Sequence, residues 1–478
     1  MNFASFQFFA FLGIVYLLYR LLPHRGQNFL LLGASYFFYG CWDWRFLGLI
    51  VLSTIVDFVV GQQLHRTESA RRRKTWLLVS LVTNLGLLAV FKYFNFFADS
   101  AQEMLGTLGW EVDWRLLQIV LPVGISFYTF QTLSYTIDIY RRKLEPVKSL
   151  PDFALFVAFF PQLVAGPIER AAVFLPQVAK PRKVNFSQSA DGLYLILFGL
   201  FKKVVIADGI APSVDAVYGA PGPYATLDVV LATWLFAIQI YCDFSAYSDI
   251  ARGVSKLLGF ELMVNFRFPF FSTNPQEFWR RWHISLSSWL RDYLYIPLGG
   301  SRGGNAMLYR NLMLTMVLGG LWHGAAWNFV LWGFFQGGIL CLHRLIVGAK
   351  PELKPVESVF DALVHFAKVV LFFQVVCYGW LLFRAESLGQ VIDLSAAVFW
   401  SWDWSMPGLP TPPLAALIGV PLLVIFDFLQ SRSRSENFDQ PFFSRWPEFC
   451  RSAVYSLLLL TLLMGLANER SAFIYFQF

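Results

Sequence analysis

The sequence predicts an all-α, polytopic membrane protein, and three observations carry that prediction. Hydrophobic residues make up 56% of the 478 positions and charged residues only 14%, whereas a soluble domain carries roughly 25% charge. Aromatic residues, which favour lipid-facing and interfacial surfaces, make up 18%. Apolar runs of about 20 residues, the length that crosses a bilayer as a helix, recur along the whole chain.

Two of the apolar segments are ambiguous. The segment 152–168 contains a proline and either spans the membrane or enters and leaves on one side. The uncharged run 311–342 would be about 48 Å long as one helix, so we expect it to tilt strongly or to break near Gly319, Gly320 and Gly324. The remaining candidate spans are 3–22, 28–42, 46–63, 75–94, 116–139, 188–207, 226–250, 358–383, 411–430 and 452–467.

Loop charges predict the orientation. The loops around 66–74 and 141–148 are basic, and the loop 99–113 is acidic. Because basic loops stay in the cytoplasm, we expect the N-terminus on the periplasmic side and explain the net charge of +7 in this way. The N-terminus lacks the features of a cleaved signal peptide. We expect one membrane-embedded domain over 1–478, with N-terminal helices (1–140), a core (141–345) and C-terminal helices (346–478).

The segment 252–310 combines positive charge with many aromatic side chains. It holds eight Lys or Arg residues against three acids. One interpretation is an amphipathic helix on anionic lipid. The other is a cytoplasmic mouth whose guanidinium groups bind the phosphates of a donor; both can hold, because such a mouth is itself interfacial. The expected phosphate ligands are Arg280, Arg281 and Arg291.

Capping signals inside this segment predict a helix over 275–292. Asn274 can cap its start, Pro275 suits the first helical position, and Glu277 follows three residues after the cap. At helical spacing, one stripe carries Trp279, Trp282, Leu286 and Trp289, and a neighbouring face carries His283, Ser287 and Arg291.

His323 is the strongest candidate for chemistry, because it lies inside the uncharged run 311–342. An ionisable residue in a membrane span is costly and indicates function by default. The small residues around it allow close helix packing and could leave room for a substrate. A neutral imidazole in a dry site can take the proton of a hydroxyl as it attacks a thioester. A neutral histidine that bonds a neighbouring helix remains the alternative.

Asp243 and Asp249 lie near the end of the span 226–250. Either acid could orient a histidine, and an ion pair with a nearby base is at least as good an interpretation. No third ligand accompanies His283 and His323 at a recognisable spacing, and the five cysteines form no metal-binding pattern. We therefore expect no metal site. The other histidines lie at loop or helix-end positions, and we expect no functional role for them: His24, His65, His343 and His365.

Two motifs, 274–300 (NPQEFWRRWHISLSSWLRDYLYIPLGG) and 319–324 (GGLWHG), resemble the membrane-bound O-acyltransferase family. The similarity is greatest to its bacterial branch, which includes transferases acting on alginate and on wall polymers. The first motif is highly specific, and the resemblance covers nearly the whole chain. Weaker matches are 164–168, 241–249, 380–384 and 473–478.

The resemblance implies a bundle of about 11–13 transmembrane or re-entrant helices around a central tunnel. In this family, donor and acceptor approach the tunnel from opposite faces. By the same resemblance, His323 is the essential catalytic histidine and His283 the second one, on the cytoplasmic approach. The expected substrate-binding residues are Arg280, Arg281, Arg291, Trp279, Trp282, Asn274, Asp243 and Trp322.

The function expected from the sequence is O-acetylation of an exported polysaccharide such as alginate, at the bacterial inner membrane. Acetyl-CoA or a related cytoplasmic thioester would be the donor, without a cofactor. The direct acceptor is either the sugar or a residue on a periplasmic protein of the acetylation pathway. We also expect contact with the lipid bilayer, and we expect no nucleic acid partner. Two alternatives remain: D-alanyl or other acyl transfer to a cell-wall polymer from a carrier protein, and non-enzymatic polysaccharide transport, although the chain lacks the internal repeat typical of transporters.

Overall fold

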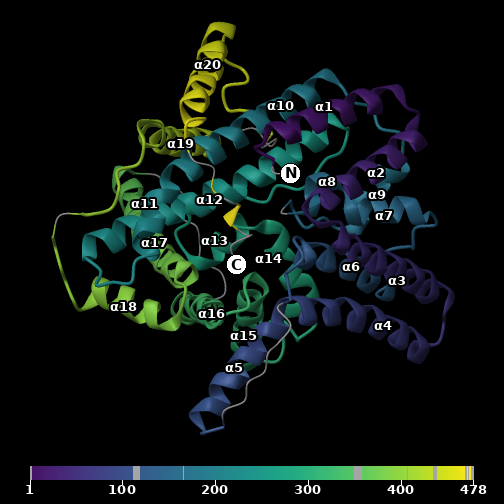
Figure 1. Cartoon of the computed structure of the whole chain (residues 1–478), viewed down its shortest axis with the longest axis horizontal. Coiled ribbons are helices and arrows are strands. Elements are labelled where there is room, and N and C mark those ends of the chain that lie inside the picture. The colour runs from purple at the N-terminus through teal and green to yellow at the C-terminus, as the bar shows by residue number, and fades with distance from the viewer. Residues whose placement is uncertain are drawn as a thin grey trace. The chain divides into compact units, whose positions relative to one another are not determined.

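The computed structural model describes residues 3–110, 119–164, 166–348, 358–405, 407–433, 439–468, 471, 473 and 474. These residues form helices and connecting loops without strands, which confirms the all-α prediction (Figure 1). Within them, seven helical runs are long and apolar enough to cross a membrane, so the chain is a multi-pass membrane protein. The runs are His24–Arg66, Ala70–Thr107, Thr226–Leu257, Trp327–Val347, Val359–Arg384, Leu414–Arg432 and Glu448–Gly465.

The chain folds into two compact units, and the first comprises residues 1–193 and 250–263. Its elements are drawn from purple through blue to teal in Figure 1. They are α1 (Phe6–Leu21), α2 (His24–Asp43), η1 (Trp44–Phe46), α3 (Leu47–Arg66), α4 (Ala70–Leu88), η2 (Ala89–Tyr93), α5 (Phe94–Thr107), α6 (Ile125–Tyr140), α7 (Leu150–Ala158), α8 (Phe160–Leu163), α9 (Ala171–Ala179), the first half of α10 (Phe186–Leu200) and the end of α12 (Thr226–Leu257).

The second unit comprises residues 194–249 and 264–478 and holds both candidate histidines. Its elements are the end of α10, η3 (Phe201–Ala207), α11 (Asp208–Tyr218), most of α12 (Thr226–Leu257), η4 (Pro269–Phe271), α13 (Pro275–Arg281), α14 (Ile284–Leu290), η5 (Arg291–Tyr295), α15 (Asn305–His323), α16 (Trp327–Val347), α17 (Val359–Arg384), α18 (Leu388–Phe399), α19 (Leu414–Arg432) and α20 (Glu448–Gly465).

Polar side chains join the helices inside the first unit. Asp57 on α3 accepts hydrogen bonds from Ser80 Oγ at 2.6 Å and from Asn84 Nδ2 at 2.8 Å, both on α4. Ser53 donates to Asn84 Oδ1 at 2.7 Å, one turn earlier on α3. Hydrogen bonds of this kind connect helices where lipid supplies no competing partner, so α3 and α4 are held in one register.

The ambiguous segment 152–168 contains two short helices instead of a span. Helix α7 has nine residues and α8 has four, whereas a crossing needs about 20. The spanning alternative is therefore wrong, and a segment that enters and leaves on one side fits these lengths. The predicted span 116–139 is observed as α6 from Ile125 onward, while residues 111–118 lie outside the described part of the chain.

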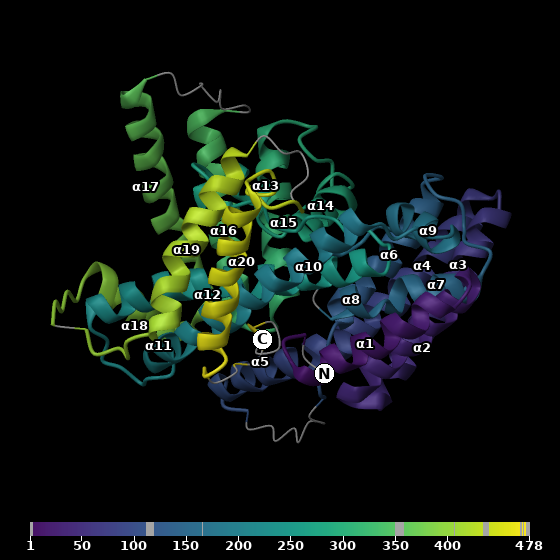
Figure 2. The ribbon, with the colours of Figure 1, turned by 90° about the horizontal axis from the view of Figure 1, so that it is seen from above.

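The long uncharged run 311–342 is broken, as one of the two alternatives predicted. Helix α15 ends at His323, Gly324 is extended (φ −154°, ψ 151°), and α16 begins at Trp327. The two helices lie side by side as an antiparallel hairpin (Figures 1 and 2). Gly333 makes this close approach possible, because a Cβ there would lie 2.9 Å from Val317 Cα.

Candidate active site

The predicted helix 275–292 is interrupted at His283, and the expectation of one continuous helix is wrong. Helix α13 ends at Arg281, α14 begins at Ile284, and His283 has left-handed backbone angles (φ 42°, ψ 55°). A non-glycine residue in this region stores about 1–3 kcal/mol of strain and persists only where its surroundings hold it. The break also divides the predicted tryptophan stripe between two helices.

Asn265 holds His283 in this conformation. Its backbone carbonyl accepts the N–H of Ile284 at 2.9 Å, and its side-chain Oδ1 lies 3.2 Å from His283 Nδ1. The same oxygen accepts the backbone N–H of Ser285 at 3.1 Å. Because an amide oxygen only accepts hydrogen bonds, Nδ1 carries the ring proton and Nε2 is left as the acceptor nitrogen of His283.

His283 is fully buried, and burial alone lowers its pKa from 6.5 to about 3. An imidazole with this pKa is neutral throughout the physiological range. With the proton fixed on Nδ1 by Asn265, His283 presents a neutral nitrogen base or hydrogen-bond acceptor. This is the protonation state that general base catalysis requires.

The ring of His323 lies close to that of His283. The ring centroids are 6.5 Å apart, and the planes are inclined by 62°. Trp322 lies beside both rings, at 5.1 Å from His323 and 5.9 Å from His283. The structure thus brings together three residues that the sequence predicted for the site, although 40 positions separate the histidines along the chain.

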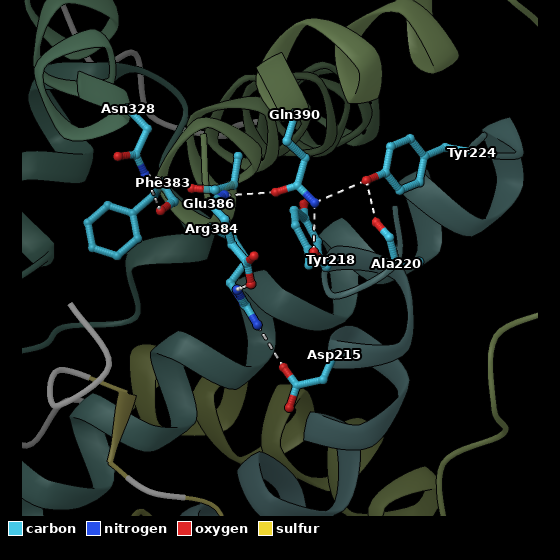
Figure 3. A network of polar contacts seen from close by, with 10 residues as sticks. Asp215, Tyr218, Ala220, Tyr224, Asn328, Phe383, Arg384, Glu386 and Gln390 are labelled. Carbon is cyan, nitrogen blue, oxygen red and sulfur yellow. Dashed lines mark hydrogen bonds and ion pairs between the residues drawn. The ribbon is translucent and has the colours of Figure 1, made fainter. Parts of the chain in front are cut away.

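A second asparagine fixes an aromatic wall beside His323. Asn328, on the first turn of α16, donates to the backbone carbonyls of Phe383 at 3.4 Å and Ala385 at 2.7 Å (Figure 3). These carbonyls belong to the C-terminal end of α17, where they have no partner within the helix. The Phe383 ring consequently lies 5.5 Å from His323 at 77°. The following residue, Arg384, pairs with Asp215 at 2.8 Å in the same network.

Asp243 lies in a buried ionic cluster. Lys203 Nζ is 2.8 Å from Asp243 and 2.8 Å from Asp208. The two acids also receive hydrogen bonds from the C-terminal segment: Asp243 from the backbone N–H of Ile474 and Asp208 from Ser471 Oγ, each at 2.6 Å. Asp243 therefore anchors the end of the chain in the second unit, which matches the ion-pair interpretation of this acid.

The predicted phosphate ligands occupy different surroundings. Arg281 pairs with Glu277 at 2.5 Å and Arg291 with Asp292 at 2.8 Å, whereas Arg280 is exposed. Asn274 caps α13 as predicted, because its Oδ1 accepts the N–H of Glu277 at 2.9 Å. Each arginine keeps part of its surface exposed, so the donor-binding role assigned to the three stays a prediction.

The two remaining predicted tryptophans, Trp282 and Trp279, contact other aromatic residues near the histidines. Trp282 is 1% exposed, and its ring lies 4.8 Å from that of Trp380 on α17. Trp279 lies 6.0 Å from Trp332 on α16, and Trp332 lies 5.1 Å from His323. Trp279 and Trp282 thus extend an aromatic cluster that reaches His323.

Sequence reasoning missed Asn265 and Asn328 as site residues. Asn265 stands alone between apolar residues, 18 positions before His283, and no helical spacing connects the two. Asn328 lies five positions after His323, but its hydrogen bonds go to the end of α17, more than 50 positions away. No local pattern marks either residue, because both act through tertiary contacts.

The fold and the site define a polytopic helical membrane protein with two neighbouring buried imidazoles. The comparison with known sequences makes this specific. The chain belongs to the membrane-bound O-acyltransferase family: the model of that family matches residues 142–353, and relatives match most of the chain. It is accordingly an O-acyltransferase.

Three relatives illustrate the range of acceptors in this family. A probable alginate O-acetylase of Azotobacter vinelandii is 41% identical over 91% of this chain and 85% of its own length. A peptidoglycan O-acetyltransferase of Helicobacter pylori is 34% identical over 81% of this chain and 77% of its own length. A teichoic acid D-alanyltransferase of Bacillus subtilis is 27% identical over 55% of this chain and 69% of its own length. The two O-acetylating relatives cover more of this chain than the D-alanyltransferase does.

Replacing Asn265 by leucine tests its role as the positioning residue of His283. The ring N–H and the Ser285 N–H would both lose their acceptor, and an unmet buried donor costs about 1–3 kcal/mol. We expect the turnover number for acyl transfer to fall at least about tenfold, which corresponds to 1.4 kcal/mol, with little change in KM. Ser248→Ala is the control, since it removes only the 3.3 Å contact to Asn265 Nδ2. If Asn265→Leu kept the same turnover number as Ser248→Ala, Asn265 would not position His283.

The lowered pKa of His283 predicts how stability depends on pH. The folded state holds the ring neutral down to about pH 3, whereas the unfolded chain protonates it near 6.5. The unfolded state therefore binds more protons between these values, and stability must fall as the pH drops from 6.5 toward 3. Thermal unfolding in detergent at pH 7 and pH 5 measures this loss. The loss should be smaller in His283→Gln, and an equal loss in both proteins would exclude His283 as its source.

Proposed function

We propose that this O-acyltransferase transfers an acetyl group from a cytoplasmic thioester to a hydroxyl group, for O-acetylation of an exported polysaccharide. The observation that carries the proposal is the pair of buried histidines whose rings are 6.5 Å apart. Two imidazoles this close together could act on the same reacting group. The names of two relatives, 41% and 40% identical to this chain, support alginate as the polymer.

In the proposed reaction, the acceptor oxygen attacks the thioester carbonyl carbon while His323 takes the hydroxyl proton. The tetrahedral intermediate then loses the thiolate: the carbon–sulfur bond breaks, and the proton passes to sulfur as the thiol leaves. The products are an ester and a free thiol. His283, neutral and with Nε2 as its acceptor nitrogen, assists on the thioester side. The assignment of the two steps to the two histidines is part of the proposal.

Arg280, Arg281 and Arg291 are the proposed contacts for donor phosphates, with acetyl-CoA as the donor. All three belong to the segment 280–291 that brackets His283 in sequence, and guanidinium groups bind phosphate through paired hydrogen bonds. The segment is partly exposed. We also propose that the protein lies in the bacterial inner membrane. Its N-terminus and the partner proteins of the acetylation pathway would then lie on the periplasmic side.

The test is turnover by the purified protein with two donors, acetyl-CoA and a D-alanyl-charged carrier protein. Thiol release that depends on added hydroxyl acceptor is measured, with boiled protein as the blank. Turnover of acetyl-CoA without a carrier supports the proposal. Turnover of the carrier-bound D-alanyl donor alone would replace it with the reaction named for the teichoic acid relatives. The proposal fails if neither donor is used.

A further inference from the structure

An aromatic cluster beside His323 contains buried hydrogen-bond donors without acceptors. Trp332 on α16 and Trp380 on α17 are each 2% exposed, and their ring centroids are 6.2 Å apart. The indole Nε1 of each is buried and has no hydrogen-bond partner among the described residues. The same holds for Nε1 of Trp279, whose ring lies 6.0 Å from Trp332.

One acceptor in the same region is also unmet. Gln336 follows Trp332 by one helical turn on α16 and is 4% exposed. Its Oε1 is buried and has no partner within the described part of the chain. Its amide lies against α17 at Gly379, since a Cβ there would meet Gln336 Nε2 at 2.8 Å. Polar groups from two helices therefore gather in one aromatic cluster.

Two exposed tryptophans of the same unit have partners for the indole N–H group. Trp234 Nε1 donates to Gln374 Oε1 at 2.9 Å, and Trp402 Nε1 donates to the carbonyl of Val398 at 3.1 Å. Buried indole N–H groups normally find such a partner, and each one left without it costs about 1–3 kcal/mol. Unmet donors gathered at one place indicate that a bound molecule supplies the acceptors.

The position of the cluster identifies the part of the substrate that fits it. The Trp332 ring lies 5.1 Å from the His323 ring at 84°. The Trp380 ring lies 5.5 Å from Phe383, which also lies 5.5 Å from His323. A group that meets these indole N–H groups at the edge of the aromatic cluster is uncharged and carries acceptor oxygens. The thioester carbonyl and the adjoining amides of an acyl donor have these properties.

We propose that the indole N–H groups of Trp332 and Trp380 form a subsite for an acyl thioester, in which Trp332 donates to the carbonyl oxygen that reacts next to His323. This inference rests on the proposed function. Negative charge develops on that oxygen when the acceptor attacks, and a fixed donor in a water-poor site stabilises the charge. Trp380 and Gln336 then bind the neighbouring polar atoms of the donor.

Trp332→Phe tests the subsite, because phenylalanine keeps an aromatic ring and removes the N–H. Loss of a single donor to a developing oxyanion typically costs about 10²–10³-fold in turnover. We expect a loss of that size in the turnover number of the purified enzyme, with a smaller change in KM and an unchanged pH profile. Trp234→Phe is the matched control, because its N–H bonds Gln374 instead, and it should stay within about twofold of wild type.

Full turnover in Trp332→Phe would overturn the proposal, and it would leave water or no molecule as the partner of this N–H. Inactivity of the wild type with every thioester would be different, since that outcome removes the proposed function itself.

A second measurement needs no variant and covers the case in which Trp332→Phe does not fold. Wild-type protein is titrated with two thioethers of coenzyme A: S-acetonyl, which keeps a carbonyl oxygen, and S-(2-methylallyl), which replaces that oxygen with a methylene group of similar shape. We expect the acetonyl compound to bind at least about tenfold more tightly, equal to 1.4 kcal/mol. Equal affinities would contradict a carbonyl-binding subsite, and absence of binding by both compounds would contradict coenzyme A as the donor.

Discussion

His323→Gln should lower the rate of acyl transfer by about 10²–10⁴-fold, the usual contribution of a general base. Glutamine keeps a polar side chain of similar length between Trp322 and Phe383 but cannot take up a proton at neutral pH. The loss should therefore appear in the single-turnover rate of purified protein, while thermal unfolding changes little. His365→Gln is the control, because His365 is exposed on α17. A His323→Gln rate within tenfold of wild type would show that this histidine is structural.

Gly320→Ala should be the most damaging single-methyl substitution near the site. A Cβ at Gly320 would overlap the carbonyl oxygen of Phe329 and lie 3.1 Å from Gly333 Cα, both on α16. Because these are backbone atoms, the hairpin must open; overpacking of this kind costs roughly 1–3 kcal/mol. His323 lies three residues further along α15, and a displacement of about 1 Å in a catalytic group can cost about 10²-fold in rate.

The control for Gly320→Ala is Gly338→Ala on α16, where an added Cβ has no atom within 4 Å. Thermal unfolding and transfer rate are measured for both variants in the same detergent. We expect Gly338→Ala to match the wild type in both measurements. If Gly320→Ala also matched it, the close contact between α15 and α16 would not determine the position of His323.

The break of the uncharged run could be predicted because it follows from local physics. A run of 32 residues exceeds the thickness of the bilayer, and small residues mark the place where the backbone leaves the helix. The cap at Asn274 is also local, since its acceptor reaches a backbone N–H three residues away. His323 could be identified as a candidate on the same ground, because an ionisable side chain inside an apolar run is conspicuous.

The conformation of His283 could not be predicted, because nothing local breaks the helix there. The residues 275–292 have the composition and the start signal of one continuous helix. The interruption depends on Asn265, which bonds the backbone at Ile284 and Ser285 from a separate segment. The same limit applies to Phe383, which lies beside His323 because Asn328 bonds the end of α17.

Asp243 shows a third kind of limit. The sequence placed it on a span and left open whether it serves a histidine or a base. Its ion pair with Lys203 depends on η3, a π-helical stretch that no sequence pattern announced. Its second partner, the backbone N–H of Ile474, lies 231 positions away. Charges inside a membrane protein find partners across the fold, so sequence shows that a partner is needed but not which residue supplies it.

The acetyl content of exported polysaccharide in a deletion strain tests most directly whether the two histidines carry out acyl transfer. The strain is complemented with wild type, His323→Gln, His283→Gln or the control His365→Gln, at matched levels of membrane protein. We expect wild type and His365→Gln to restore acetylation, whereas the two site variants secrete polymer without acetyl groups. Normal acetylation by His323→Gln would contradict the central claim that acyl transfer takes place at this pair of buried histidines.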